Sequence, residues 1–565
     1  MKLFQQLLVA PAALGLLAPV AVQAVELNID GVNKYAAEEQ VTSINQFSDV
    51  KPTDWAFQAL SNLIERYGCV AGYPNGTYKG GQAMTRYEAA ALLNACLDRI
   101  TEVTDELKRL MAEFEKELAV LRGRVDGLEA KVGELEATQF STTTKLTGKA
   151  TFVLGANSYG GNAVVSPLAA AVLGPVRGTT FANQASSLQG GTVFNYDIQL
   201  NFDTSFTGKD LLRTRLRAGN FADSPFGGKQ LVGLNAMEVA FEEFAGQDVV
   251  GINRLFYQFP LGSSFTATIG GRVRQDDMLA VWPSAYPADT VLDIFTYAGA
   301  PGTYSLNLGS GGGLWWKSGG FSVSANYVSF NGDNGNPIEG TTDCGGIGTA
   351  CSTQTGTAQI AYTGSNFGIA AAYTYSSGGA GLYAGNGTPL AVDLQNFAAA
   401  TNSVGISAYW QPTNSGWIPS ISTGWGINTS NYNGSTLTAY SPFVSTTGIT
   451  QATSQSWYVG LQWDDVFIKG NSFGMAVGQP TFLTAVNRGS LNQATFGAPN
   501  ANGIVDGNYA WEWWYKFQVT DNISVTPALF YLSAPLGQIG KNVDTGATGS
   551  DFNNFGGLIK TTFKF

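Results

Sequence analysis

The chain of 565 residues contains no histidine at all. This absence excludes histidine-based catalytic triads, histidine general bases and histidine metal sites. Charged side chains are also scarce, because Asp, Glu, Lys and Arg make up only 13% of the chain, against roughly 25% in an average protein. The 31 cationic residues are outnumbered by 42 acidic ones. The sequence therefore argues against a nucleic-acid-binding protein, which needs a basic surface.

Long hydrophobic runs are missing beyond the N-terminus. The one apolar run, residues 7–22, follows Lys2, is interrupted by two prolines and ends near small residues at Ala24. It falls short of the ~18 residues that a spanning helix needs, so a cleaved secretory signal over residues 1–24 is favoured over a membrane anchor. An exported chain without a later apolar run can reside in a membrane only as a closed β-barrel.

The segment 45–100 has the pattern of a small helical module. Apolar residues recur at helical spacing from Trp55 to Ile64, and the turn at residues 72–76 ends that helix. Thr85 and Glu88 have capping-box spacing for a second helix. The stretches FSDVKPTDWAFQAL and YGCVAGYPNGTYKGGQAMTRYEAAALL resemble one S-layer-homology (SLH) module. The resemblance implies binding to peptidoglycan or its linked polysaccharide.

Four residues fall at positions that this resemblance associates with glycan contact, namely Asp49, Trp55, Arg86 and Glu88. Arg86 is the best suited of them, because a guanidinium can hold an acidic sugar substituent through two parallel hydrogen bonds. The other three have structural alternatives: Trp55 in the core, Asp49 as a helix cap and Glu88 in the capping box. Wall-anchoring relatives usually carry three modules in tandem, whereas this chain has one.

Residues 101–138 carry a heptad repeat typical of a coiled coil. Eight apolar residues from Met111 to Leu135 follow one another in steps of three and four. The g and following e positions bring opposite charges together in a parallel homo-oligomer, which a single amphipathic helix packed on its own domain would not require. Val125 and Val132 at a positions favour two strands, but the barrel resemblance below implies three, so dimer and trimer both stay open.

The segment 140–565 predicts β-strands throughout. Apolar and polar residues alternate in ~10-residue stretches separated by turns rich in Gly, Ser, Asn and Thr, as in outer-membrane barrels. A secreted β-solenoid would show a fixed repeat period, and none is present. The predicted fold is an all-β transmembrane barrel of about 16 antiparallel strands, preceded by the SLH module and the coiled-coil helix.

One SLH module, a coiled coil and a long barrel ending in Phe565 together resemble the cyanobacterial outer-membrane porins related to the carbohydrate-selective OprB-type family, often named iron-uptake porins. The resemblance implies a homo-oligomer, in this family a trimer, in the outer-membrane lipid, with the module and the coil in the periplasm. It also implies that the barrel-assembly machinery recognises Phe565. We expect no cofactor and no metal.

Six of the eight arginines of the barrel lie within 62 residues. Strand alternation predicts that they face the lumen, because each would cost ~2–4 kcal/mol on the lipid face near the midplane. A basic wall of this kind favours anions; the alternative is simple pairing with the inward acids Asp197 and Asp203. These predicted pore-lining residues are Arg213, Arg215, Arg217, Arg254, Arg272 and Arg274.

The segment 275–304 is a candidate inward-folding loop. It would set acidic side chains against the arginines across a constriction, and the acids concerned are Asp276, Asp277, Asp289 and Asp293.

The four cysteines fit an oxidising compartment. Cys69 and Cys96 both lie in the helical module, and Cys344 and Cys351 share one loop, so these two disulfides are favoured among three possible pairings. Metal binding is the weaker reading, because no CxxC motif and no histidine accompany the cysteines.

The favoured function is a passive porin for ions and small hydrophilic solutes, tethered to the wall. The alternatives are a structural tether with a plugged barrel and a substrate-selective porin for carbohydrate or iron. An enzyme is disfavoured, because common hydrolase triads fail without histidine.

Overall fold

The computed structural model describes most of the C-terminal part of the chain and pieces of the N-terminal part. The described residues are 43–54, 57–68, 70, 76–83, 89, 93, 124–125, 143–165, 179–228, 231–240, 247–339, 341, 343–383, 385–413, 416–432, 449–488, 504–541 and 549–565. The chain divides into two compact units, residues 1–137 and 138–565.

The first unit has a small helical core. It contains the 3-10 turn η1 (Ile44–Gln46), the helix α4 (Phe57–Asn62) and the π-helical turn η2 (Leu63–Tyr67). Apolar side chains from these elements pack together, and Gly68 ends the helix in the left-handed conformation that glycine adopts without strain. Of the predicted coiled coil, only residues 124 and 125 are described, both helical, and the heptad interface lies outside the described residues.

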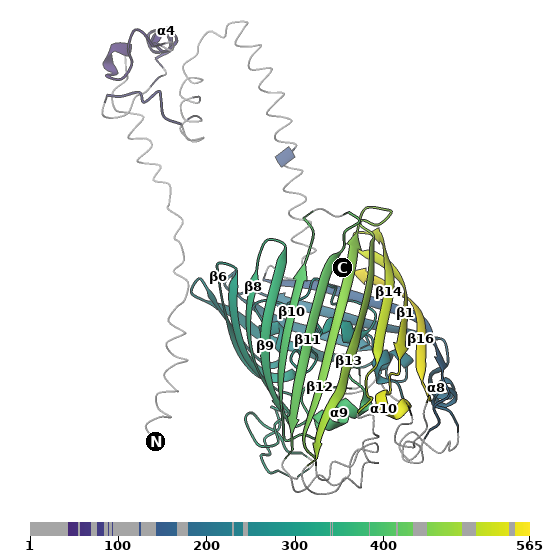
Figure 1. Cartoon of the computed structure of the whole chain (residues 1–565). Coiled ribbons are helices and arrows are strands. Elements are labelled where there is room, and N and C mark those ends of the chain that lie inside the picture. The colour runs from purple at the N-terminus through teal and green to yellow at the C-terminus, as the bar shows by residue number, and fades with distance from the viewer. Residues whose placement is uncertain are drawn as a thin grey trace, which may run out of the picture. The chain divides into compact units, whose positions relative to one another are not determined.

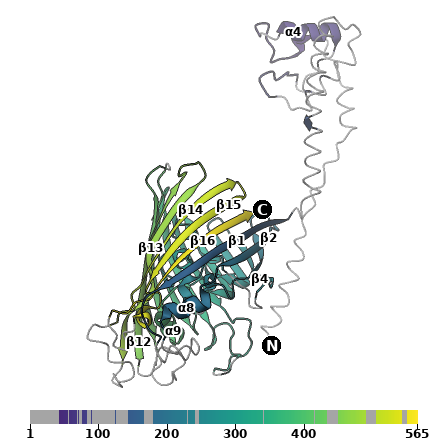
Figure 2. The ribbon, with the colours of Figure 1, turned by 90° about the vertical axis from the view of Figure 1, so that its right-hand side faces the viewer.

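The second unit is a closed barrel in which every strand pairs antiparallel with its sequence neighbours and β1 pairs with β16 (Figures 1 and 2). This confirms the predicted fold class. Within the described residues the sixteen strands are β1 (Thr144–Gly160), β2 (Val193–Thr204), β3 (Leu211–Gly219), β4 (Gly251–Leu261), β5 (Phe265–Arg274), β6 (Leu308–Ser318), β7 (Phe321–Ser329), β8 (Gln354–Thr363), β9 (Phe367–Ser377), β10 (Ala400–Trp410), β11 (Ser420–Asn431), β12 (Ile449–Asp464), β13 (Ser472–Arg488), β14 (Tyr509–Thr520), β15 (Ile523–Ser533) and β16 (Asn553–Lys564).

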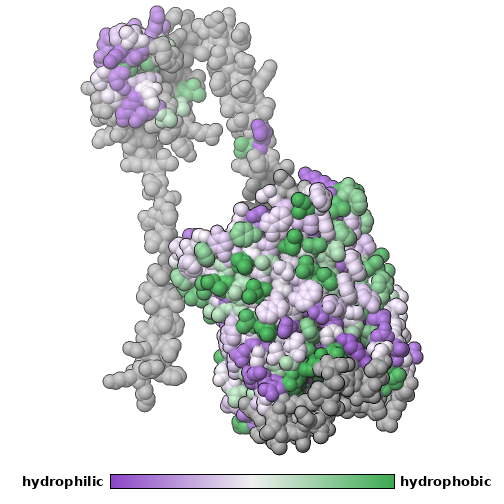
Figure 3. Space-filling view, viewed as in Figure 1, coloured by the Kyte–Doolittle hydropathy of each residue, from purple (hydrophilic) through white to green (hydrophobic). Residues whose placement is uncertain are grey.

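Apolar side chains point outward from the barrel. On β16, Phe555 and Ile559 are 45% and 46% exposed, whereas Lys560 and Thr562, which follow them, are buried on the inner face. Figure 3 shows hydrophobic residues spread over the visible face of the barrel. This is the reverse of a soluble sandwich and suits a wall that lipid surrounds.

The two ends of the barrel differ in their connections. The end that carries Lys564 has short turns, such as the one at Gly319 and Gly320 between β6 and β7. The other end carries longer connections with the helices α8 (Phe181–Gln189), α9 (Pro389–Asn396) and α10 (Gly537–Gly540) (Figure 1). In outer-membrane barrels the short turns face the periplasm, so the chain enters and ends at the periplasmic mouth. Among the described residues, no helix is both long and apolar enough to cross a membrane.

Four short 3-10 turns lie in the connections after β3 and after β5. They are η3 (Pro225–Gly227), η4 (Gly233–Asn235), η5 (Gln275–Met278) and η6 (Asp293–Thr296). Both connections carry buried apolar side chains that pack against the inner wall. The largest apolar core of the described residues is therefore inside the barrel, where it narrows the lumen.

Candidate functional site

The connection between β5 and β6 folds into the lumen, as the sequence predicted for residues 275–304. The carbonyl oxygen of Ala298 accepts a 2.7 Å hydrogen bond from Ser407 of β10, and that of Gly299 accepts one of 2.9 Å from Ser456 of β12. Near its end, Tyr304 donates to Gln359 of β8 at 2.9 Å. We name residues 275–304 the inner loop; it is bonded to the inward side chains of strands far apart in sequence.

Glycines on the inner wall allow the backbone of the inner loop to lie directly on the strands. A Cβ atom at Gly424 of β11 would overlap the carbonyl oxygen of Ala298, and one at Gly426 would lie 2.9 Å from the Cα of Ala300. Strands disfavour glycine unless another backbone approaches closely, which is the arrangement here.

A buried carboxylate holds the middle of the inner loop. Glu512 of β14 is fully buried and accepts hydrogen bonds from the Tyr286 hydroxyl at 2.8 Å and from the Leu292 amide at 2.7 Å. The Tyr286 hydroxyl in turn accepts from the indole of Trp514 at 2.9 Å. The sequence analysis assigned Glu512 no role; an acid inside a strand of six aromatic residues was the available signal.

Asp289 attaches the inner loop to the opposite part of the wall. Its carboxylate lies 2.7 Å from the ammonium of Lys560 on β16 and 3.6 Å from that of Lys149 on β1. Burial alone would raise the pKa of Asp289, but these two ammonium groups hold it well below its usual range. Asp289 thus faces lysines rather than the predicted arginines.

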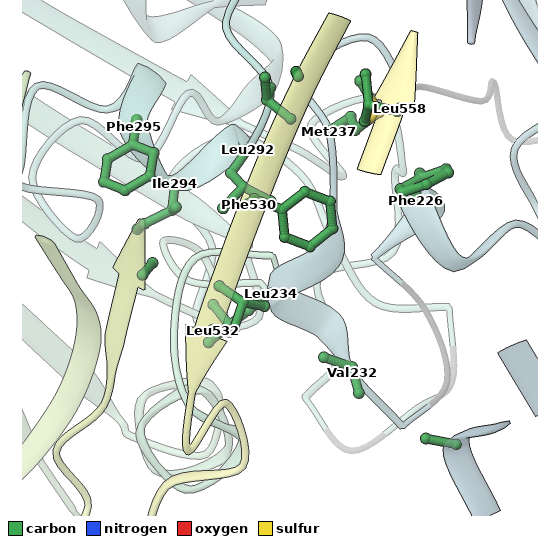
Figure 4. Close-up of a cluster of buried hydrophobic side chains, with 14 of the residues drawn as sticks. Phe226, Val232, Leu234, Met237, Leu292, Ile294, Phe295, Phe530, Leu532 and Leu558 are labelled. Carbon is green, nitrogen blue, oxygen red and sulfur yellow. The ribbon is translucent and has the colours of Figure 1, made fainter. Parts of the chain in front are cut away.

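A second connection between β3 and β4, with residues 220–228 and 231–240 described, also lies inside the barrel. Phe226, Leu234 and Met237 pack with Leu292 and Phe295 of the inner loop and with residues of β15 and β16 (Figure 4). The sequence analysis did not predict this second inward segment. Its signal was an apolar stretch between two strands, which periodicity alone does not distinguish from wall residues.

The arginines of β3 pair mainly along the wall. Arg213 binds both oxygens of Asp203, at 2.8 and 2.7 Å. Arg217 binds Asp197 at 2.7 Å, and both side chains are almost fully buried. At both positions the arginine pairs with an inward acid, which is the alternative that the sequence left open. Arg215 donates to the Asn201 side chain at 2.6 Å.

The arginines of β4 and β5 meet acids at the start of the inner loop. Arg254, 1% exposed, lies 2.6 Å from Asp277. Arg274 lies 2.5 Å from Asp276, whose burial would raise its pKa but whose pKa is lowered overall by that guanidinium. These two acids therefore lie beside the arginines instead of across an opening from them.

Arg272 is not on the predicted inward row. A bulge in β5 shifts the register between Gly270 and Val273, so that Arg272 pairs with Leu255, whose side chain is 40% exposed on the outer face. Val273 is fully buried against Phe256 instead. The prediction that alternation continues unbroken through Arg272 is wrong, because a bulge exchanges the two faces of a strand.

Opposite charges do face each other around a cavity of about 250 Å³. Arg217, Arg254 and Arg274 line it together with Glu238 and Asp293 of the two inward segments, and the Arg217 guanidinium donates a 3.4 Å hydrogen bond to the Glu238 carbonyl oxygen. Burial raises the pKa of Asp293 to about 7, although the Tyr297 hydroxyl donates a hydrogen bond to it at 3.0 Å. The cavity therefore carries three guanidinium groups and one carboxyl group, that of Asp293, whose charge changes near neutral pH. We call it the charged constriction.

Among the four predicted glycan-contact residues, Asp49 alone is described. Its two carboxylate oxygens accept the backbone amides of Tyr78 and Lys79 at 2.6 and 2.5 Å, and the hydrogen bond from Tyr78 is the main cause that lowers its pKa. Asp49 thus connects two segments of the module, instead of capping a helix. Trp55, Arg86 and Glu88 lie outside the described residues.

Cys344 and Cys351 are joined by a disulfide in the connection between β7 and β8. Cys69 and Cys96, the other predicted pair, lie outside the described residues. Within the described ranges, no group of three or more Cys, Asp and Glu side chains is arranged to hold a metal ion.

Comparison with known proteins identifies the family. Residues 102–565 match the carbohydrate-selective porin, OprB family, and residues 46–90 match the S-layer homology domain. The chain belongs to the OprB family of porins. As such it is an outer-membrane channel protein rather than an enzyme, and its SLH domain belongs to a class that binds cell-wall polymers.

Full-length relatives of this porin occur in cyanobacteria. An uncharacterized protein of Nostoc sp. is 34% identical, with 95% of this chain and 88% of the relative covered, and one of Synechocystis sp. is 31% identical, with 93% and 91% covered. The outer membrane protein SlpA of Deinococcus radiodurans is 35% identical over 105 residues, 17% of this chain and 9% of that protein. The solved structure of Pseudomonas putida OprB aligns at a TM-score of 0.43 and 13% identity, covering 75% of this chain and 94% of that one.

Proposed function

We propose that this porin is a passive channel for ions and small hydrophilic solutes, and that the charged constriction selects among them. The observation that carries the proposal is that Arg217, Arg254 and Arg274 line one cavity together with Glu238 and Asp293. Opposed charges in a narrow, low-dielectric passage order water and act on every ion that enters it.

The ion pairs decide which arginine can be replaced to test ion selectivity. Arg213 and Arg217 are neutralised by Asp203 and Asp197, so removing either guanidinium leaves an uncompensated acid. Arg215 bonds a neutral amide, and it forms no ion pair with any described residue. Arg215 is therefore the position where loss of a charge changes ion selectivity with the least structural damage.

The test is conductance in planar bilayers, with reversal potentials measured in a salt gradient. We expect discrete channels in the wild type and a shift toward cations in Arg215→Gln. The matched control is Lys469→Gln, which removes one exposed cation from the turn between β12 and β13. Arg215 is paired with Arg254 of the charged constriction across β3 and β4, so unchanged reversal potentials in Arg215→Gln would remove the basic wall next to the constriction from the mechanism.

A second candidate is a wall tether whose barrel is closed. The apolar core formed inside the lumen by the two inward segments favours it, because that core fills space which an open pore would leave to water. Absence of any channel in bilayers, with correctly folded protein, would favour the tether. Measurable flux of sugars or iron complexes in liposomes would instead favour a substrate-selective porin.

We also propose the partners that accompany this function. The SLH module would bind peptidoglycan or its linked polysaccharide, and the chain would assemble as a homo-trimer through its heptad repeat. Phe565 would be read by the barrel-assembly machinery; its backbone pairs in both directions with Gly148 of β1, at 2.6 and 3.0 Å. Cross-linking of the native protein tests the trimer, and sedimentation with purified wall tests the module.

A further inference from the structure

A second polar cavity, of about 200 Å³, lies at the periplasmic end of the lumen, away from the charged constriction. Three neighbouring strands line it with lysines and hydroxyl side chains, namely Lys516 on β14, Ser524 and Thr526 on β15, and Lys560, Thr562 and Lys564 on β16, and Asp289 is the acidic residue in its described lining. The hydroxyl strand thus lies between two strands that carry lysines. We call this cavity the lysine vestibule.

The register of the strands brings the lysines together. Lys564 is directly opposite Lys149 of β1, and Lys560 is directly opposite Thr526. Like charges directly opposite each other destabilise a strand pair unless something compensates them. The lipid face cannot accept these side chains, so they remain inside and share one aqueous space.

The acids nearby compensate only part of this charge. Asp289 is bound by Lys560 and by Lys149, and Glu512 is bound by Tyr286 and the Leu292 amide. Lys516 and Lys564 form no ion pair within the described part of the chain, although Lys564 is placed opposite another lysine. The vestibule therefore keeps an excess of positive charge.

Hydroxyl groups in the vestibule can add directional hydrogen bonds to the attraction of the positive charge. Thr526 is only 6% exposed, lines the cavity and makes no side-chain hydrogen bond with any described residue. A buried hydroxyl normally has a partner, which here has to come from the contents of the cavity. The volume is below the ~300–1,000 Å³ typical of pockets for larger organic ligands, so it fits a small hydrated ion.

We propose that the lysine vestibule binds a small tetrahedral oxyanion of the phosphate class. Lys516 and Lys564 supply charge from the two flanking strands, and the hydroxyl of Thr526 donates a hydrogen bond from the strand between them. Lys560 contributes its charge while it remains bonded to Asp289. The site shares no lining residue with the charged constriction, and none of the arginines in the described part of the chain lines it.

The experiment is a calorimetric titration of inorganic phosphate into the full-length protein in detergent, at constant ionic strength in chloride. This readout does not require the lumen to conduct, so its outcome is separate from that of the proposed function. We expect saturable binding in the wild type, weakened at least about tenfold in Lys516→Gln/Lys564→Gln, the factor for loss of a charge-assisted hydrogen bond.

Two further variants separate a built site from general attraction. Thr526→Val keeps the shape and every charge, and should also weaken phosphate binding. Lys317→Gln removes a cation from β6, outside the vestibule, and should leave binding unchanged. Retention of native oligomer and strand content by each variant establishes that it folds. Absence of saturable binding in the wild type, or an equal loss in Lys317→Gln, or wild-type binding in Thr526→Val, would overturn the proposal.

Discussion

The contact between the inner loop and the glycines of β11 can be tested with one methyl group. Gly424→Ala places a Cβ against the carbonyl oxygen of Ala298, which belongs to backbone and cannot turn aside. The loop must therefore move off the wall toward the lumen. This movement also breaks the 2.7 Å hydrogen bond from Ser407 to the same carbonyl oxygen.

The magnitude follows from these two effects. Overpacking a well-packed interior costs about 1–3 kcal/mol. Loss of one neutral hydrogen bond costs about 0.5–1.5 kcal/mol. Together we expect the free energy of unfolding to fall by roughly 2–4 kcal/mol. Because Ala298 moves toward the charged constriction, single-channel conductance should fall as well.

Gly356→Ala on β8 is the matched control, because no atom lies within 4 Å of the Cβ it would add. It makes the same change in a strand without touching the inner loop. Both variants are compared by single-channel recording and by denaturant unfolding followed by tryptophan fluorescence. If Gly424→Ala keeps wild-type conductance and stability, the inner loop does not lie on β11 as described.

Three further predictions concern other parts of the molecule. Because burial raises the pKa of Asp293 to about 7, its carboxyl group is neutral below that pH and charged above it, and reversal potentials should shift toward cations from about pH 6 to pH 8. The variant Asp293→Asn should abolish this shift. The contribution of the carboxyl group to stability should decline as pH rises through 7, because the folded state holds this proton more tightly than the unfolded state. Glu512→Ala removes the acceptor of the Tyr286 hydroxyl proton and of the buried Leu292 amide. It should lower the free energy of unfolding by about 3–5 kcal/mol and make the conductance noisy, whereas Glu512→Gln should cost less. Gly148→Val should impair membrane assembly, measured by heat-modifiable migration in gels, because its side chain would occupy the position of the Phe565 ring; normal assembly would argue against a role for that ring.

The closed barrel was predictable because successive residues of each strand point alternately toward lipid and toward water, so that apolar and polar residues alternate in the sequence. A row such as Tyr509 to Val519 admits one outward face, and the length of the segment 140–565 predicts the strand count. The predicted inward orientation was wrong for Arg272, because a bulge cannot be recognised from the alternation of residues and becomes visible only when the pairing partners are known.

The inner loop was predictable as a segment, because it interrupts the alternation and concentrates acids. The wall residues that bind the inner loop were not predictable. Asp289 was expected opposite arginines and binds Lys560, which is 271 residues away in sequence. Such a partner is chosen by the direction in which the loop crosses the lumen, and local sequence contains no information on that direction.

By itself, the sequence determined the SLH module and the barrel that follows it, because each depends on local motifs or on a short repeating period. Tertiary structure alone decided which acid faces which cation and how much of the lumen remains open. Those outcomes depend on close packing between two inward segments and a curved wall, where glycines such as Gly424 and a buried acid such as Glu512 fix the position of backbone from distant parts of the chain.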